Sequence, residues 1–139
     1  MAESSDPPCT ESLLSALNLI EEAIKLCGNA ESDPSHQSLL NNKAQVLRLL
    51  GRDSEALECL NIVISAADVT NKMVLRQASA QRGWLHFRSK DTESAFKDFE
   101  RAGKLGCLES RRMAVRCNPY AAMCNQMLQS VIESKFYSK

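Results

Sequence analysis

The residues of this chain that could do chemistry are its six cysteines and two histidines. Thiols and imidazoles at close spacing bind zinc, and a thiol beside a histidine can act as a nucleophile. The cysteines stand at positions 9, 27, 59, 107, 117 and 124, so none forms a CxxC pair, and His36 and His86 complete no zinc-binding pattern. These spacings favour small packing groups over metal ligands. They leave one pair, Cys117 and Cys124, as a thiol redox or metal alternative.

The sequence also lacks the common motifs of enzymes. The sequence contains no GxSxG, HExxH, P-loop or dinucleotide-binding signature. Such motifs place the reactive groups of hydrolases, zinc proteases and nucleotide-binding enzymes. The sequence therefore predicts a protein that is not an enzyme and that carries no cofactor or metal.

Composition and charge are those of an ordinary soluble domain. The 139 residues are 44% hydrophobic and 24% charged, and 17 basic side chains balance 17 acidic ones. This balance gives no overall field for nucleic acid or an anionic membrane, and no apolar run reaches the roughly 18 residues of a membrane span. The first residues show no secretion signal. We therefore expect a cytoplasmic protein that binds neither nucleic acid nor membranes.

The elements that must position these side chains are predicted to be helices. Apolar residues at offsets of three and four, with few glycines and prolines between them, mark seven segments. The segments cover residues 12–27, 37–50, 53–67, 71–89, 91–106, 109–117 and 119–136. Asp53, Asn71 (or Thr70) and Asp91 are the predicted N-caps of three of them. No segment alternates like a strand, so the fold class is all-α. Residues 1–11 have no periodicity and are expected to form a disordered arm.

Two of the predicted helix pairs, at residues 37–67 and 71–106, repeat one another. In both pairs a small residue of the first helix lies twelve positions before a small residue of the second: Ala44 before Ala56, and Gly83 before Ala95. Small residues at such places let antiparallel helices approach closely. Residues 12–27 are a partial first copy, and residues 109–136 form C-terminal helices. The pattern resembles the tetratricopeptide repeat, which implies one solenoid domain over residues 12–139.

A more specific resemblance rests on four stretches of sequence. These are NNKAQVLRLLGRDSEALE (41–58), QASAQRGW (77–84), KDFERAGKLG (97–106) and NPYAAMCNQML (118–128). Together they resemble the tetratricopeptide repeat protein 36 family. The resemblance implies a cytosolic adaptor that associates with a chaperone of the Hsp70 class. It also implies a role in supporting the stability of an enzyme of tyrosine catabolism.

The candidate binding residues follow from the register of the repeats. Stacked helix pairs leave a concave face, lined by the first helix of each pair, that can hold a peptide. We predict that this face carries Asn41, Asn42, Gln45, Arg48, Gln77, Gln81, Trp84 and Arg88. Amides can bond a peptide backbone, arginines can pair with a carboxylate, and Trp84 is either an apolar anchor in the groove or a core residue.

The family resemblance also bears on how a partner would be held. Chaperone-binding members of the superfamily hold the carboxylates of an acidic tail with a clamp of Lys, Asn and Arg. Asn42 matches the clamp asparagine, whereas Gln77 and Gln81 stand where the third repeat would carry its Lys and Arg. The resemblance thus implies a chaperone contact that does not depend on this clamp alone.

The last predicted helix begins with a good start signal. Asn118 is a favoured N-cap, Pro119 suits the first helical position, and Cys117 can pack against Ala122. One face then carries Tyr120, Cys124, Met127, Leu128 and Val131. We expect this face to cap the open core of the last repeat. We expect a monomer, and the alternative is a structural subunit that hides the uncovered side of residues 12–27 in an oligomer.

Overall fold

Helices make up the described part of the protein. The computed structural model describes residues 9–28, 33–66 and 71–136. The described residues form α1 (Cys9–Cys27), α2 (Pro34–Leu49), α3 (Asp53–Ala66), α4 (Lys72–Arg88), α5 (Thr92–Lys104), α6 (Leu108–Cys117) and α7 (Pro119–Phe136), with no strand among them. The predicted all-α fold class is confirmed. None of these helices has the length and apolar character needed to cross a membrane.

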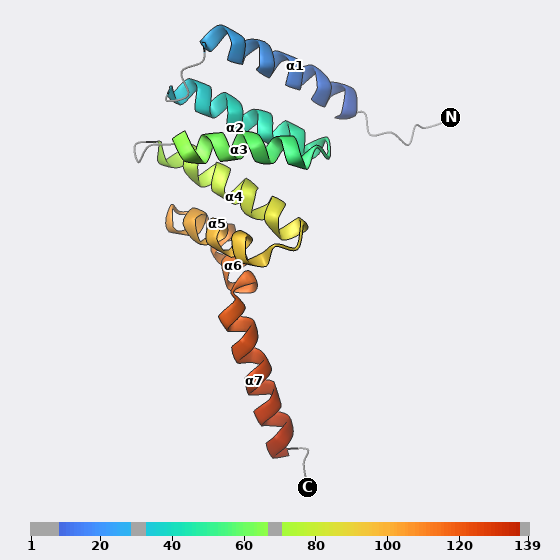
Figure 1. Cartoon of the computed structure of the whole chain (residues 1–139), viewed down its shortest axis with the longest axis vertical. Coiled ribbons are helices and arrows are strands. Elements are labelled where there is room, and N and C mark those ends of the chain that lie inside the picture. The colour runs from blue at the N-terminus through green and yellow to red at the C-terminus, as the bar shows by residue number, and fades with distance from the viewer. Residues whose placement is uncertain (1–8, 29–32, 67–70, 137–139) are drawn as a thin grey trace, which may run out of the picture.

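The helices pack in chain order into a short solenoid (Figure 1). Each helix from α1 to α6 packs on the next, and α2 also touches α4 directly. The first helices of the two complete pairs, α2–α3 and α4–α5, therefore form one continuous layer. This layer is the one from which the sequence predicted the binding face.

Helix starts follow the expected capping chemistry, with small shifts in position. The Asp33 side chain accepts a hydrogen bond from Ser35 N (3.0 Å), and Pro34 begins α2 three residues earlier than predicted. The Asn118 side chain accepts from Tyr120 N (2.9 Å) at the start of α7, as predicted. α1 begins at Cys9, so the last residues of the predicted arm are helical, and residues 1–8 lie outside the described ones.

Two of the predicted caps act differently. Asp53 is the first residue of α3, and the carbonyl of Arg52 accepts the first helical bond, from Ala56 N (3.1 Å). The Asn71 side chain makes no capping bond and donates instead to the Gln37 side chain (3.1 Å). Both side chains lie at the predicted helix starts, but they bond to side chains on neighbouring helices instead of capping the backbone.

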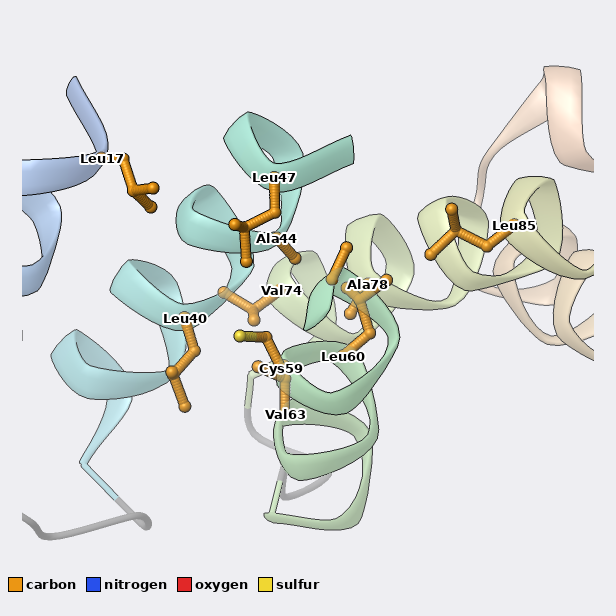
Figure 2. Packing of buried hydrophobic residues seen from close by; sticks show 11 residues of the cluster. Leu17, Leu40, Ala44, Leu47, Cys59, Leu60, Val63, Val74, Ala78 and Leu85 are labelled. Atoms are coloured by element: carbon orange, nitrogen blue, oxygen red, sulfur yellow. The ribbon is translucent and has the colours of Figure 1, made fainter. Parts of the chain in front are cut away.

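The core lies between the stacked helices, in two regions. Figure 2 shows the larger one, built from α1, α2, α3 and α4. The second surrounds Phe99, which has no exposed surface, and includes Met113, Ala114 and Cys117 of α6. The small residues have the predicted purpose: a Cβ atom on Gly83 would lie 2.9 Å from the Phe99 ring.

The prediction that α7 caps the last repeat is wrong. α6 fills this position, since its apolar side packs into the second core region. α7 extends away from the solenoid (Figure 1), and the side chain of Tyr120 is 73% exposed. Because α6 already covers the apolar surface near Phe99, none is left beside α7 for its own apolar face. The proposed contact of Cys117 with Ala122 lies outside the described side chains.

Asp91 gives a testable dependence of stability on pH. Its side chain accepts from Ser94 N (3.2 Å) at the start of α5, and hydrogen bonds from Ser94 lower the pKa of the Asp91 carboxyl. A lowered pKa means that the stabilisation is present above the ordinary carboxyl pKa and is lost as pH falls through the folded-state pKa. We expect Asp91→Ala to lower the melting temperature at neutral pH, and the difference from the parent chain to become smaller in acid.

Thermal melts followed by circular dichroism across the acid range check this. Asp91→Asn is the control, because a neutral amide is an equally good cap and does not titrate. A difference between Asp91→Ala and the parent that stays constant down to the lowest pH would contradict the role of the charge.

Candidate functional site

A ladder of amide side chains joins α2 to α4 on the concave layer. Asn41 Nδ2 donates to Gln77 Oε1 (2.9 Å), and Gln81 Nε2 donates to Asn41 Oδ1 (2.8 Å). Asn41 is only 3% exposed, so its polar atoms depend on these partners. The ladder fixes the separation of the two helices and holds Gln77 and Gln81 in defined positions.

A second set of amides extends the ladder toward the start of α4. Gln37 is buried, and its Nε2 donates to the carbonyl of Ala66 (3.0 Å) at the end of α3. Its Oε1 accepts from Asn71 Nδ2 (3.1 Å). Gln37 was not among the residues predicted from the sequence, although its position on the side of α2 that faces the other helices could have indicated it. This residue ties three helices together at one end of the layer.

Seven of the eight predicted binding residues come together in one hollow. The hollow has a volume of about 360 Å³ and is lined by Asn41, Asn42, Gln45, Arg48, Gln77, Ala80, Gln81 and Trp84. Helical spacing placed these residues on the facing sides of α2 and α4, and the stacking of the two helices brings them together. We call this site the α2–α4 hollow.

The α2–α4 hollow contains polar atoms that are buried but have no partner. Arg48 Nε and Gln81 Oε1 make no hydrogen bond with any described residue. Buried polar atoms cost free energy unless they are bonded, so both atoms favour a ligand that supplies an acceptor and a donor. Asn42, Gln45 and Gln77 are exposed and add further amide groups at the edge.

The eighth predicted residue, Arg88, does not line the α2–α4 hollow. Its guanidinium donates to the Asp53 carboxylate (3.1 Å) and both side chains are about half exposed. Arg88 and Asp53 line a separate recess of about 350 Å³ where the end of α4 meets the start of α3. The position on α4 was consistent with the concave face, but the acidic residue on α3 draws the long arginine side chain away.

Trp84 belongs both to the core and to the α2–α4 hollow, the two roles that the sequence left open. Its ring packs edge-on against Phe99 (centroids 5.5 Å apart) and Phe87 (5.9 Å), so one side belongs to the second core region. The residue is only partly buried, and its other side lines the α2–α4 hollow. A ring held by its neighbours in this way offers a rigid apolar surface to a ligand.

A buried ion pair supports α4 from the side of α5. The Asp98 carboxylate, with its side chain 4% exposed, accepts two bonds from the Arg82 guanidinium, from Nε (2.8 Å) and Nη2 (2.7 Å). Arg82 Nη1 also donates to Asn61 of α3 (2.9 Å), and His86 Nε2 lies 3.7 Å from Asp98. The histidine that could have been chemically active thus lies in a structural network. No signal in the repeat pattern singled out this pair.

Two of the described cysteines, Cys59 and Cys117, are poorly suited to act as activated thiols. Burial raises the pKa of the Cys59 and Cys117 thiols, which opposes formation of the reactive thiolate. Cys117 packs into the second core region, whereas Cys124 is exposed on α7. The described ranges contain no group of three His, Cys, Asp or Glu residues able to hold a metal ion. Packing is therefore seen for Cys117, whereas the side chain of Cys124 is exposed and does not pack into the core.

Curated relatives align with most of this chain. The chain is 41% identical to tetratricopeptide repeat protein 36 of Danio rerio over 131 residues, which are 94% of this chain and 63% of that protein. It is 40% identical to the tetratricopeptide repeat protein 36 homolog of Drosophila melanogaster (85% and 60% covered), and 39% identical to the Homo sapiens protein (71% and 52%). The chain thus spans between 52% and 63% of the length of these three relatives. No protein-family model and no solved structure matches it with significance.

Proposed function

Because the chain belongs to the tetratricopeptide repeat protein 36 family, we propose that it is a non-enzymatic adaptor that holds a segment of a partner protein in the α2–α4 hollow. The observation that supports this most directly is the gathering of seven polar and aromatic side chains around one recess between two repeats. Stacked helical repeats use this concave layer to bind extended segments.

The chemistry of the α2–α4 hollow indicates the kind of segment that it holds. Gln81 Oε1 is a free acceptor for a backbone N–H, and Arg48 is the cationic group that can pair with one carboxylate. Trp84 offers an apolar surface for a neighbouring side chain. The ladder through Asn41 holds Gln81 in place before the partner arrives, which reduces the entropy lost on binding.

The family resemblance extends the proposal to partners and location. It implies a cytoplasmic protein that binds a chaperone of the Hsp70 class and supports an enzyme of tyrosine catabolism as a client. Arg48 is the one cation among the residues that line the α2–α4 hollow, with neutral Gln77 and Gln81 opposite it. We therefore propose that the hollow takes a segment with a single carboxylate, rather than the paired carboxylates that a clamp of several cations would hold.

Substitution of the two arginines tests the site. We expect Arg48→Ala to weaken binding of a purified Hsp70-class chaperone at least tenfold, since truncation of a hot-spot arginine typically costs about 2 kcal/mol or more. Arg88→Ala is the matched control, because it truncates the same side chain outside the α2–α4 hollow. Isothermal titration calorimetry measures both, with circular dichroism to show that each variant folds.

The outcomes separate the two parts of the proposal. If the parent chain does not bind the chaperone, the chaperone assignment is wrong. If both arginine variants bind as the parent does, or lose affinity equally, the α2–α4 hollow is not the binding site.

A further inference from the structure

Two apolar helix faces lie uncovered at opposite ends of the solenoid. The first belongs to α7, whose exposed side chains fall at offsets of three and four on one stripe: Tyr120, Met123, Met127, Leu128 and Val131. In proteins a helix gains most of its stability from the packing of its apolar face, so an apolar stripe of this kind points to a helix that packs on something else.

The second uncovered face belongs to α1. Ala16 and Ala23 hold the places that Ala95 and Ala102 hold in α5, where both are fully buried. In α1 the two alanines are only partly buried, because α2 covers one side of α1 and no described helix covers the other.

Large apolar side chains flank these alanines on the uncovered side. Leu19 is 66% exposed and Leu26 is 88% exposed, seven residues further along the same side of the helix. Alanines between projecting leucines form a surface into which the side chains of another helix can pack. This surface on α1 therefore matches the requirements of a helix such as α7.

The two helices also match in length and charge. α1 has 19 residues and α7 has 18. In an antiparallel arrangement, Lys135 near the end of α7 comes beside Glu11 near the start of α1. These exposed, opposite charges attract at this end of such a pair.

We propose that α7 of one copy packs antiparallel on the uncovered face of α1 in a second copy. α1 and α7 lie at opposite ends of the solenoid (Figure 1), so the contact joins two copies head to tail. Because the two surfaces differ, the contact is heterologous and leaves a free α1 at one end and a free α7 at the other. The assembly grows with concentration into rings or open chains, in contrast to the monomer expected from the sequence.

Light scattering after size-exclusion chromatography tests this on the 139-residue chain. We expect the parent mass to rise above 15.4 kDa with concentration. Leu19→Lys and Met127→Lys each bury an unpaired charge in the contact, so each should weaken association at least tenfold and return the mass to 15.4 kDa. Asn18→Lys and Gln126→Lys place the same charge on exposed positions outside the two faces, and both should assemble like the parent.

Mixing the two disrupted variants distinguishes this contact from others. The Leu19→Lys chain keeps an intact α7, and the Met127→Lys chain keeps an intact α1. The two altered faces carry like charges at facing positions, so they repel each other. Their mixture should form a one-to-one complex of twice the 15.4 kDa chain mass and grow no further. Pairing of α7 with α7 would leave Leu19→Lys assembled and give no complex on mixing, which would overturn the proposal. A parent chain that stays at 15.4 kDa up to hundreds of micromolar, with α7 binding another protein or a lipid surface instead, would overturn it as well.

Discussion

Replacing Phe99 by alanine is expected to lower the free energy of unfolding by about 4 kcal/mol. Phe99 has no exposed surface, and its ring packs edge-on against Trp84 and directly over Gly83. α4 and α6 meet this ring from two sides, so neither helix can move into the space without losing its other contacts. Urea denaturation followed by circular dichroism measures the change.

Phe96→Ala is the matched control, because Phe96 lies on the same helix and is only partly buried. We expect it to cost less than half as much. Gly83→Ala adds a second check: a Cβ there meets the Phe99 ring at 2.9 Å, so the substitution should cost about 1 to 3 kcal/mol in the parent. In the Phe99→Ala background it should be neutral or stabilising by up to about 1 kcal/mol. A loss of the same size in both backgrounds would mean that Gly83 is not small to admit this ring.

The fold could be predicted because its information lies in local spacing. Small residues twelve positions apart, at Ala44 and Ala56 and at Gly83 and Ala95, fixed the pairing of helices without reference to the rest of the chain. The role of α7 could not be predicted in this way. Its apolar stripe indicates that a face needs cover, but only the packing of α6 shows that the last core is already filled.

The candidate binding site, too, could be predicted only in part. Helical register placed Asn41 and Gln81 on facing helices, and the structure joins them at 2.8 Å. Helical register did not show that the Arg88 side chain would bond to Asp53, or that the Asn71 side chain would bond to Gln37 instead of capping its helix. Both bonds depend on partners that lie far away in the sequence. The position of a residue on a helix can be predicted from one sequence. The bonding partner of a long polar side chain can be predicted only when the neighbouring helix is known.

Asp98→Asn is expected to lower the free energy of unfolding by about 3 kcal/mol, the second largest effect that we predict. The substitution keeps the shape of the side chain but removes the charge opposite the Arg82 guanidinium, whose side chain is 19% exposed. The guanidinium is held by Asn61 as well as by Asp98, so it cannot turn freely toward water. Removing one partner of a buried pair costs more than the pair contributes, because the remaining charge stays buried without compensation.

Two further variants show whether this uncompensated charge is the cause. Arg82→Met combined with Asp98→Leu removes both charges and should recover most of the loss, since replacing a buried ion pair by apolar residues of similar volume is often neutral. Asp53→Asn breaks the other arginine pair of α4, where Asp53 and Arg88 are about half exposed, and it should cost no more than about 1 kcal/mol. If the double variant is as unstable as Asp98→Asn alone, the geometry of the bonded pair rather than an isolated charge holds α4 against α5. If Asp53→Asn costs as much as Asp98→Asn, burial does not distinguish the two pairs.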